Sequence, residues 1–309
     1  MPDEKKAERC PYSLNIRIAD LSFSVSACHP LYREDLPEVY QPFLGQPDNS
    51  KSDADISVDL ELNNPPETGR MKNIFDTNDS WSIYLDGNVY VMILNPATLD
   101  RRVVWAARFA HDVRQISIFC SDLLLSRTNG SDRLLNPFRY PLDQVLVMYA
   151  LARREGAVIH AAGMSVNGRG FIFPGKSGAG KSTLSRQFLN RTNIGMLSDD
   201  RVAVRKLKGG FEAFGTPWAG DAGIAENKNF PLSGIFFIHH SEKNRIKEIK
   251  PNEAIKRLMP VTSIPWYDEK IMSGILSFCE ELVFNVPAYE LHFKPDSEVV
   301  DFFEKFVSA

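Results

Sequence analysis

The chain has 309 residues, of which 43% are hydrophobic and 24% charged, a composition typical of a globular protein with about two domains. Its 36 Lys and Arg residues against 39 Asp and Glu residues give a formal net charge of −3, which argues against nucleic acid as a partner. No apolar run approaches the roughly 20 residues that a transmembrane helix needs, so we expect no membrane span.

The first residues, MPDEKKAERC, are charged and lack the apolar segment of a signal peptide. The cysteines Cys10, Cys28, Cys120 and Cys279 show no C-x-x-C spacing. We therefore expect free thiols in a reducing compartment rather than a disulfide or zinc framework. Together these features predict a cytoplasmic protein.

Residues 1–135 are predicted to form a smaller N-terminal accessory domain that is mainly β or α+β. Apolar and polar residues alternate there at the period of a strand, and Asp-Gly-Asn at residues 86–88 is a strong hairpin signal. The predicted elements are strands within 14–25, 56–60, 81–85, 89–94 and 115–119, a helix at Val103–Val113, and a turn at 129–132 that marks the boundary. The region has no catalytic motif, and its lone histidines, His29 and His111, are interpreted as structural.

Residues 136–309 alternate between strand and helix patterns, which predicts an α/β domain. The predicted helices are 141–154, the segment after Gly180, 252–258, 268–282 and 297–307, and the predicted strands are 157–162, 164–166, 171–173, 194–198, 202–206, 211–214, 235–238 and 289–293. Asn167-Gly168 and Gly209-Gly210 lie between paired strands and predict two further hairpins.

One stretch of this domain carries a phosphate-binding pattern. Residues 171–183 read FIFPGKSGAGKST and contain G-x-x-x-x-G-K-S between a predicted strand and a predicted helix. Glycines let successive backbone N–H groups turn toward one anion, and the helix N-terminus adds its free N–H groups and dipole. The alternative is a glycine-rich turn before an unrelated helix. The predicted nucleotide-binding residues are Gly175, Ser177, Gly178, Ala179, Gly180, Lys181, Ser182 and Thr183.

Within this loop, Lys181 is expected on the β- and γ-phosphates of ATP and the Ser182 hydroxyl on Mg²⁺. An apolar strand at 194–198 then ends in Asp199 and Asp200. Acids at a strand end shortly after the loop helix suit the Mg²⁺ side of a nucleotide site, although they are also common on surfaces. His160 precedes the loop on a strand, and a core histidine is the alternative interpretation.

Two later segments have weaker signals. The glycine-rich segment 215–223, GTPWAGDAG, is a candidate lid or substrate loop in which Trp218 and Asp221 close over substrate. His239 and His240 end an apolar strand and are interpreted as a surface pair without a role.

The run IHAAGMSVNGRGFIFPGKSGAGKST…LSDDRVAV is similar to the catalytic domain of HPr kinase/phosphorylase and its relatives. The later GTPWAGDAG…ENKNFPLSGIFFIHHSEKN resembles the HPr-kinase-related branch, which includes kinases of serine in peptides or small molecules. The resemblance covers residues 140–300. It implies a phosphoenolpyruvate-carboxykinase-like P-loop fold, a mixed twisted sheet with flanking helices, and a homo-oligomer.

The resemblance also implies roles for single residues. Asp199 falls on the acid that accepts the serine hydroxyl proton, Asp200 on the metal-side acid, and His160 on the active-site histidine. This chain has Lys176 where the family's loop usually has Asp, and Thr183 where it has Glu. The missing Asp weakens the case for phosphorylase activity, and the segment with which the family enzyme grips HPr is not recognisable.

The sequence therefore predicts an ATP- and Mg²⁺-dependent kinase that phosphorylates a serine-type hydroxyl on a protein, a peptide or a small molecule. Catalysis is assigned to Asp199, His160 and Lys181, and metal binding to Ser182 and Asp200. The alternatives are a nucleotide-binding switch and an ATP-binding regulatory protein with little or no transferase activity.

Overall fold

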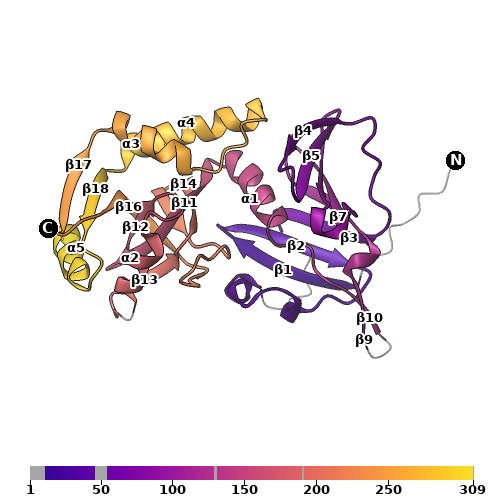
Figure 1. Ribbon diagram of the computed structural model, residues 1–309, viewed down its shortest axis with the longest axis horizontal. Coiled ribbons are helices and arrows are strands. Elements are labelled where there is room, and N and C mark those ends of the chain that lie inside the picture. The colour runs from indigo at the N-terminus through magenta and orange to yellow at the C-terminus, as the bar shows by residue number, and fades with distance from the viewer. Residues whose placement is uncertain (1–10, 46–53, 129–130, 190, 309) are drawn as a thin grey trace. The chain divides into compact units, whose positions relative to one another are not determined.

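The computed structural model describes residues 11–45, 54–128, 131–189 and 191–308 (Figure 1). The chain divides into two compact units. The first comprises the described residues up to Arg17 together with Leu21–Leu146, and the second comprises Ile18–Asp20 and the residues from Val147 onward. The unit changes at Leu146, inside helix α1 (Leu142–Ala152), whereas the sequence places the boundary near residue 135.

The first unit is built on an eight-stranded mixed sheet of order β1-β2-β3-β8-β7-β6-β5-β4. Its strands are β1 (Tyr12–Ile18), β2 (Leu21–Ala27), β3 (Ile56–Leu62), β4 (Lys72–Asp76), β5 (Trp81–Asp86), β6 (Val89–Leu94), β7 (Trp105–Ala110) and β8 (Gln115–Cys120). Strand β3 runs parallel to β2 and β8, and β4 to β8 form an antiparallel meander. The predicted hairpin at residues 86–88 is confirmed as the β5–β6 turn.

The helix predicted at Val103–Val113 is wrong, because Trp105–Ala110 forms strand β7. Its alanines favour a helix locally. However, β7 pairs with β6 on one side and with β8 on the other, and Trp105 and Phe109 are buried. Ladder hydrogen bonds and burial in the middle of a sheet therefore outweigh the local preference.

The remaining elements of the first unit are short. They are the 3₁₀ helices η1 (Arg33–Asp35), η2 (Glu38–Phe43), η3 (Ala97–Leu99) and η4 (Asp122–Leu124), and the hairpin of β9 (Leu125–Thr128) and β10 (Ser131–Leu134). The turn predicted at 129–132 falls partly outside the described residues. Cys120 and Cys279 are free thiols as predicted, but Cys28 is disulfide-bonded, so that expectation is wrong for Cys28.

The second unit contains a mixed sheet of order β12-β11-β14-β15-β16-β18-β17, in which β13 also pairs with β11 and β12 with β16. Its strands are β11 (Gly156–Val166), β12 (Arg169–Pro174), β13 (Ile194–Ser198), β14 (Arg201–Leu207), β15 (Gly210–Phe214), β16 (Asn229–His240), β17 (Arg245–Ile249) and β18 (Ala288–Phe293). Strand β16 runs parallel to β12 and β18, and the other pairs are antiparallel. Strands β11 and β16 are longer than predicted because each serves two sets of neighbours.

The helices of this region match the predicted ones to within a few residues. After α1 they are α2 (Lys181–Phe188), α3 (Pro251–Leu258), the 3₁₀ helix η5 (Met259–Val261), α4 (Glu269–Asn285) and α5 (Glu298–Ser308). Pro251 occupies the first turn of α3, where its missing N–H has no cost. Asp268 caps α4 by accepting a hydrogen bond from the Ile271 N–H at 3.3 Å. No helix in the described part of the chain is long and apolar enough to cross a membrane.

An aromatic core supports the strand that leads into the predicted phosphate-binding loop. Phe171 and Phe173 of β12 and Phe236 of β16 meet Phe188 of α2 and Phe303 of α5, and all five are buried. Their ring centroids lie 4.9–6.4 Å apart in the contacting pairs. Figure 1 shows α2 and α5 on one side of this sheet and α3 and α4 on the other. Burial on both faces fixes the end of β12.

Gly215 packs closely against the backbone of Leu197 and Glu226, and a substitution there tests this packing. A Cβ there would lie 1.9 Å from the Glu226 carbonyl oxygen and 2.7 Å from the Leu197 carbonyl oxygen. Both are backbone atoms that no side-chain rotation moves. We expect Gly215→Ala to lower the free energy of unfolding by about 3 kcal/mol and the Tm by several degrees, as measured by urea and thermal unfolding.

The matched control is Gly209→Ala, because a Cβ at Gly209 meets no atom within 4 Å. We expect that variant to stay within about 0.5 kcal/mol of the parent. Equal stability of the two variants would show that the backbone at Gly215 relaxes freely.

Candidate functional site

The predicted strand, turn and helix around the phosphate-binding pattern are present as β12, residues 175–180 and α2. Gly178 has a φ of 81°, which favours glycine, and at two further glycines of the loop a Cβ would clash. A Cβ on Gly175 would lie 2.8 Å from the Ala179 Cβ. Gly180 has a φ of 97°, and a Cβ there would lie 2.6 Å from the His240 Nε2. The loop is therefore folded so tightly that larger residues at these two positions do not fit.

The loop leads directly into α2, and the first backbone N–H groups of this helix are free to bind a ligand. Gly180 is the N-cap residue, and no side chain caps the helix. The first N–H groups of an α-helix have no partner within the helix and carry the positive end of its dipole. This arrangement favours a bound anion, and phosphate is the usual one.

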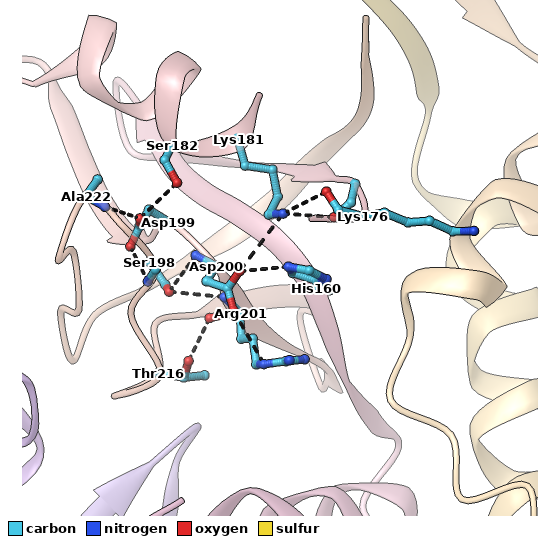
Figure 2. Close-up of polar contacts among 12 residues, drawn as sticks. His160, Lys176, Lys181, Ser182, Ser198, Asp199, Asp200, Arg201, Thr216 and Ala222 are labelled. Carbon is cyan, nitrogen blue, oxygen red and sulfur yellow. Dashed lines mark hydrogen bonds and ion pairs between the residues drawn. The ribbon is translucent and has the colours of Figure 1, made fainter. Parts of the chain in front are cut away.

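The Lys181 side chain lies inside the loop. Its Nζ donates to the carbonyl oxygens of Gly175 at 3.0 Å and Lys176 at 3.2 Å, and lies 4.0 Å from Asp200 Oδ1 (Figure 2). Burial lowers the pKa of Lys181, and the nearby carboxylates of Asp200 and Asp199 only partly offset this. A ligand with several negative charges would stabilise the ammonium form.

Asp199 is fully buried, and its carboxylate accepts four hydrogen bonds. Its Oδ1 accepts from the N–H groups of Gly220 at 2.8 Å and Ile224 at 3.2 Å. Its Oδ2 accepts from the Ala222 N–H at 2.7 Å and the Ser182 hydroxyl at 3.3 Å. One carboxylate thus binds the glycine-rich segment 215–224 to the first turn of α2.

Asp200, the next residue, faces the other way and pairs with His160. The His160 Nε2 donates to Asp200 Oδ1 at 2.7 Å, and Arg201 Nε lies 3.5 Å from Asp200 Oδ2 (Figure 2). The pairing of β11 with β14 sets His160 opposite Arg201, which explains why the pair meets. Burial raises the pKa of Asp200, but His160, Arg201 and Lys181 together outweigh burial, so the pKa of Asp200 lies below its ordinary value.

A pocket of about 270 Å³, which we call the first pocket, lies against the loop, the start of α2 and Asp200. Seven predicted site residues line it: Ser177, Gly178, Gly180, Lys181, Ser182, Thr183 and Asp200. Gly175, Ala179, His160 and Asp199 do not line it. They support the lining residues from outside the pocket. Gly175 and Ala179 do so through the turn of the loop, His160 through its pair with Asp200, and Asp199 through the hydrogen bond from Ser182.

Four further residues line the first pocket: Arg186, Gly220, Asp221 and His240. Gly220 and Asp221 lie in the segment predicted as a lid or substrate loop, whereas the sequence did not identify Arg186 or His240 as binding residues. His240 packs on Phe293 at 4.9 Å and faces Gly180 across the pocket wall. Arg186 donates to the Asp221 carbonyl oxygen at 3.1 Å. Trp218, expected to close over substrate, is instead buried in the packed segment, so only Asp221 of that pair is placed at the pocket.

The oxygen donors here suit Mg²⁺ held mainly by phosphates and water. Ser182 contributes a hydroxyl, Asp199 a carboxylate hydrogen-bonded to it, and Asp200 a carboxylate in the same pocket lining. In the described ranges, no group of three His, Cys, Asp or Glu side chains forms a cage of protein ligands. The burial of Asp199 and its four donors leave it suited to positioning the Ser182 hydroxyl rather than to binding the ion itself.

The pKa of Asp200 leads to a pH-dependent prediction. Because this pKa is lowered on folding, the ionised carboxylate stabilises the fold above the ordinary range of Asp, and that contribution is lost as the pH falls through the folded-state pKa. We expect Asp200→Asn to be less stable than the parent near pH 7, with the difference shrinking below about pH 4. Urea unfolding between pH 7 and pH 3 measures it.

Asp301→Asn is the control, because Asp301 pairs with Arg191 at 3.0 Å with 72% of its side chain exposed. We expect a small effect at every pH for this pair. A stability difference for Asp200→Asn that does not change with pH would contradict the assigned environment.

All of these groups lie within one stretch of the chain that matches a known family. Residues 139–294, just over half of the chain, match the family model described as SynChlorMet cassette protein ScmC. No curated protein gives a significant match. The matched stretch begins just before α1 and includes the loop, both acids and the segment that binds Asp199. The chain belongs to the ScmC family of SynChlorMet cassette proteins.

Proposed function

We propose that this protein is an ATP- and Mg²⁺-dependent phosphotransferase that phosphorylates a serine-type hydroxyl, as its resemblance to HPr kinase implies. The proposal rests chiefly on one observation. Of two adjacent acids, Asp200 lines the first pocket and pairs with His160, whereas Asp199 lies behind the lining and accepts a hydrogen bond from the Ser182 hydroxyl. Phosphoryl transfer needs groups that bind the phosphates and a carboxylate beside the attacking hydroxyl that can accept its proton.

The phosphate cradle is supplied by the loop and Lys181. The Lys181 ammonium donates hydrogen bonds to two backbone carbonyl oxygens, which are uncharged and therefore weak partners for a positive charge. Phosphate oxygens are stronger partners, and the lowered pKa of Lys181 would rise when they bind. Bound Mg²⁺ would neutralise further charge on the phosphates, with the Ser182 hydroxyl as the group that holds it and Asp199 positioning that hydroxyl from behind.

The contacts favour exchanging the two roles that the family resemblance assigns to the acids. Asp199 has no exposed surface and accepts four hydrogen bonds, so a substrate hydroxyl does not reach it. Asp200 lines the first pocket with 27% of its side chain exposed. We therefore assign the hydroxyl-orienting role to Asp200 and the metal-side role to Asp199.

His160 then acts as a positioning residue for Asp200. Its Nε2–H group occupies one lone pair of Oδ1 and fixes the orientation of the carboxylate. A carboxylate with a low pKa remains sufficient, because the serine hydroxyl becomes acidic only as the bond to phosphorus forms. With ATP as donor, we also propose that the protein acts in the cytoplasm.

The first prediction of this proposal concerns Lys181. Lys181→Ala removes the only cation that contacts the loop carbonyls among the described residues. We expect ATP turnover in the presence of serine-bearing acceptors to fall on the order of 10²- to 10³-fold. Lys305→Ala, an exposed lysine on α5, should leave turnover unchanged. Radiolabel transfer from γ-labelled ATP measures both.

The exchanged roles of the acids give a second prediction. We expect Asp200→Asn to lose transfer by at least about 10²-fold while Mg·ATP affinity changes little. Asp199→Asn places an amide NH₂ group where one carboxylate oxygen accepts two hydrogen bonds, at least one of them from a backbone N–H, so it should lower both the Tm and the apparent affinity for Mg²⁺. Calorimetric titration and transfer assays separate the two patterns.

If Asp199→Asn keeps its Mg²⁺ affinity and Asp200→Asn keeps its transfer rate, the exchange is wrong. If the parent protein binds Mg·ATP tightly but transfers phosphate to no serine-bearing acceptor, the regulatory alternative with little or no transferase activity replaces the kinase proposal.

A further inference from the structure

The sheet of the second unit gives the first pocket two different sides. Strand β12, which leads into the loop, pairs with β11 on one side and with β16 on the other. Strand β11 also pairs with β13 and β14, and the bend between those two strands contains Asp200. Asp200 therefore lines the first pocket from the β11 side, and His240, the last residue of β16, lines it from the opposite side.

The direction of a bound triphosphate follows from the loop. In loops of this pattern the lysine binds the β- and γ-phosphates, and backbone N–H groups bind the α- and β-phosphates. The Lys181 Nζ lies 4.0 Å from Asp200 Oδ1, which places the γ-phosphate toward the β11 side. The α-phosphate and the nucleoside then point toward the β16 side, where His240 lies.

The imidazole ring of His240 has a rigid support. In the parallel pairing of β16 with β18, His240 lies opposite Phe293. The two ring centroids are 4.9 Å apart, with an interplanar angle of 38°. Phe293 is fully buried, whereas His240 is exposed. The buried ring therefore holds the imidazole in place at the pocket while the imidazole remains accessible to a ligand.

The ring pair of His240 and Phe293 lies beside the start of α2. A Cβ at Gly180 would lie 2.6 Å from the His240 Nε2 and 3.3 Å from the Phe293 Cζ. Because Gly180 has no side chain, both rings approach the residue that caps α2. The ring pair is therefore adjacent to the backbone N–H groups that are predicted to bind phosphate, on the side toward which the nucleoside points.

His239, the preceding residue, does not line the first pocket. It lines a second pocket, of about 300 Å³, together with residues that include Gly175, Lys176 and Phe237. Consecutive residues of a strand point to opposite faces, so the two histidines at the end of β16 face different pockets. His239 thus provides a matched control for His240.

We propose that His240 stacks on the base of the bound nucleotide, with Phe293 supporting it from behind. The inference rests on the proposed binding of Mg·ATP. An accessible aromatic ring beside a phosphate site suits a nucleobase, because stacking needs only the flat face of the base. The opposite side of the first pocket, with Asp200, Gly220 and Asp221, is then left for the acceptor hydroxyl.

Two probes that differ in the base test this inference: Mg·ATP and the Mg²⁺ complex of ribose 5-triphosphate. In calorimetric titrations of the full chain, we expect Mg·ATP to bind at least about tenfold more tightly. His240→Ala should remove this preference and leave the affinity for ribose 5-triphosphate unchanged, because the phosphate-binding groups stay in place. His240→Phe retains an aromatic ring and should keep the preference, and His239→Ala should behave like the parent protein.

NMR provides a second measurement that reports on the base alone. In saturation-transfer experiments with Mg·ADP, we expect the adenine ring protons to receive strong saturation from the parent protein. His240→Ala should reduce this transfer, and His239→Ala should not.

The outcomes separate this inference from the proposed function. Equal affinity of the parent protein for the two probes overturns the inference, and so does a base preference that survives in His240→Ala. An equal loss of both probes in His240→Ala assigns His240 to the phosphates or to the fold of the loop and also overturns it.

Two further outcomes concern the proposed function. A base preference that depends on His240, without phosphate transfer to any acceptor, supports the base site and removes the kinase proposal. Failure of the parent protein to bind either probe overturns both the inference and the proposed function.

Discussion

The buried carboxylate of Asp199 is the interaction on which the candidate site depends. It satisfies three backbone N–H groups of segment 215–224 and the Ser182 hydroxyl at once. A buried charge without such partners would cost several kcal/mol, so the carboxylate and the segment stabilise each other. Segment 215–224, the end of β13 and the start of α2 therefore form one structural unit. This unit determines the shape of the first pocket.

Asp199 and Asp200 are adjacent in the sequence but lie in different environments. In the bend between β13 and β14, Asp199 faces the backbone donors and Asp200 faces His160 and Arg201. The first is fixed and fully hydrogen-bonded, and the second is partly exposed at the pocket. In the proposed function, the first positions the metal side of the site and the second orients the acceptor hydroxyl, so that neighbouring residues of one chain segment divide the two roles.

Sequence patterns predicted much of this arrangement, because local rules dominate there. The loop glycines, the hairpins and the helices around α3 to α5 follow from periodicity and turn chemistry. Strand β7 was mistaken for a helix because sheet pairing is non-local. The exchange of Asp199 and Asp200 depends on which face each side chain occupies, and the likeness to a phosphoenolpyruvate-carboxykinase-like fold stays a prediction. The role of His240 at the pocket depends on a neighbour, Gly180, that lies 60 positions away.

The alternation at the end of β16 has a consequence for how the chain can evolve. His239 and His240 belong to different pockets only because the strand keeps its two-residue period up to its end. Substitutions there change one pocket and leave the other intact. Insertion or deletion of a single residue in β16 would exchange the linings of both pockets together with the faces of Phe236 and Phe237. Length variation is therefore expected in the loops that flank β16, and the strand itself has a fixed length.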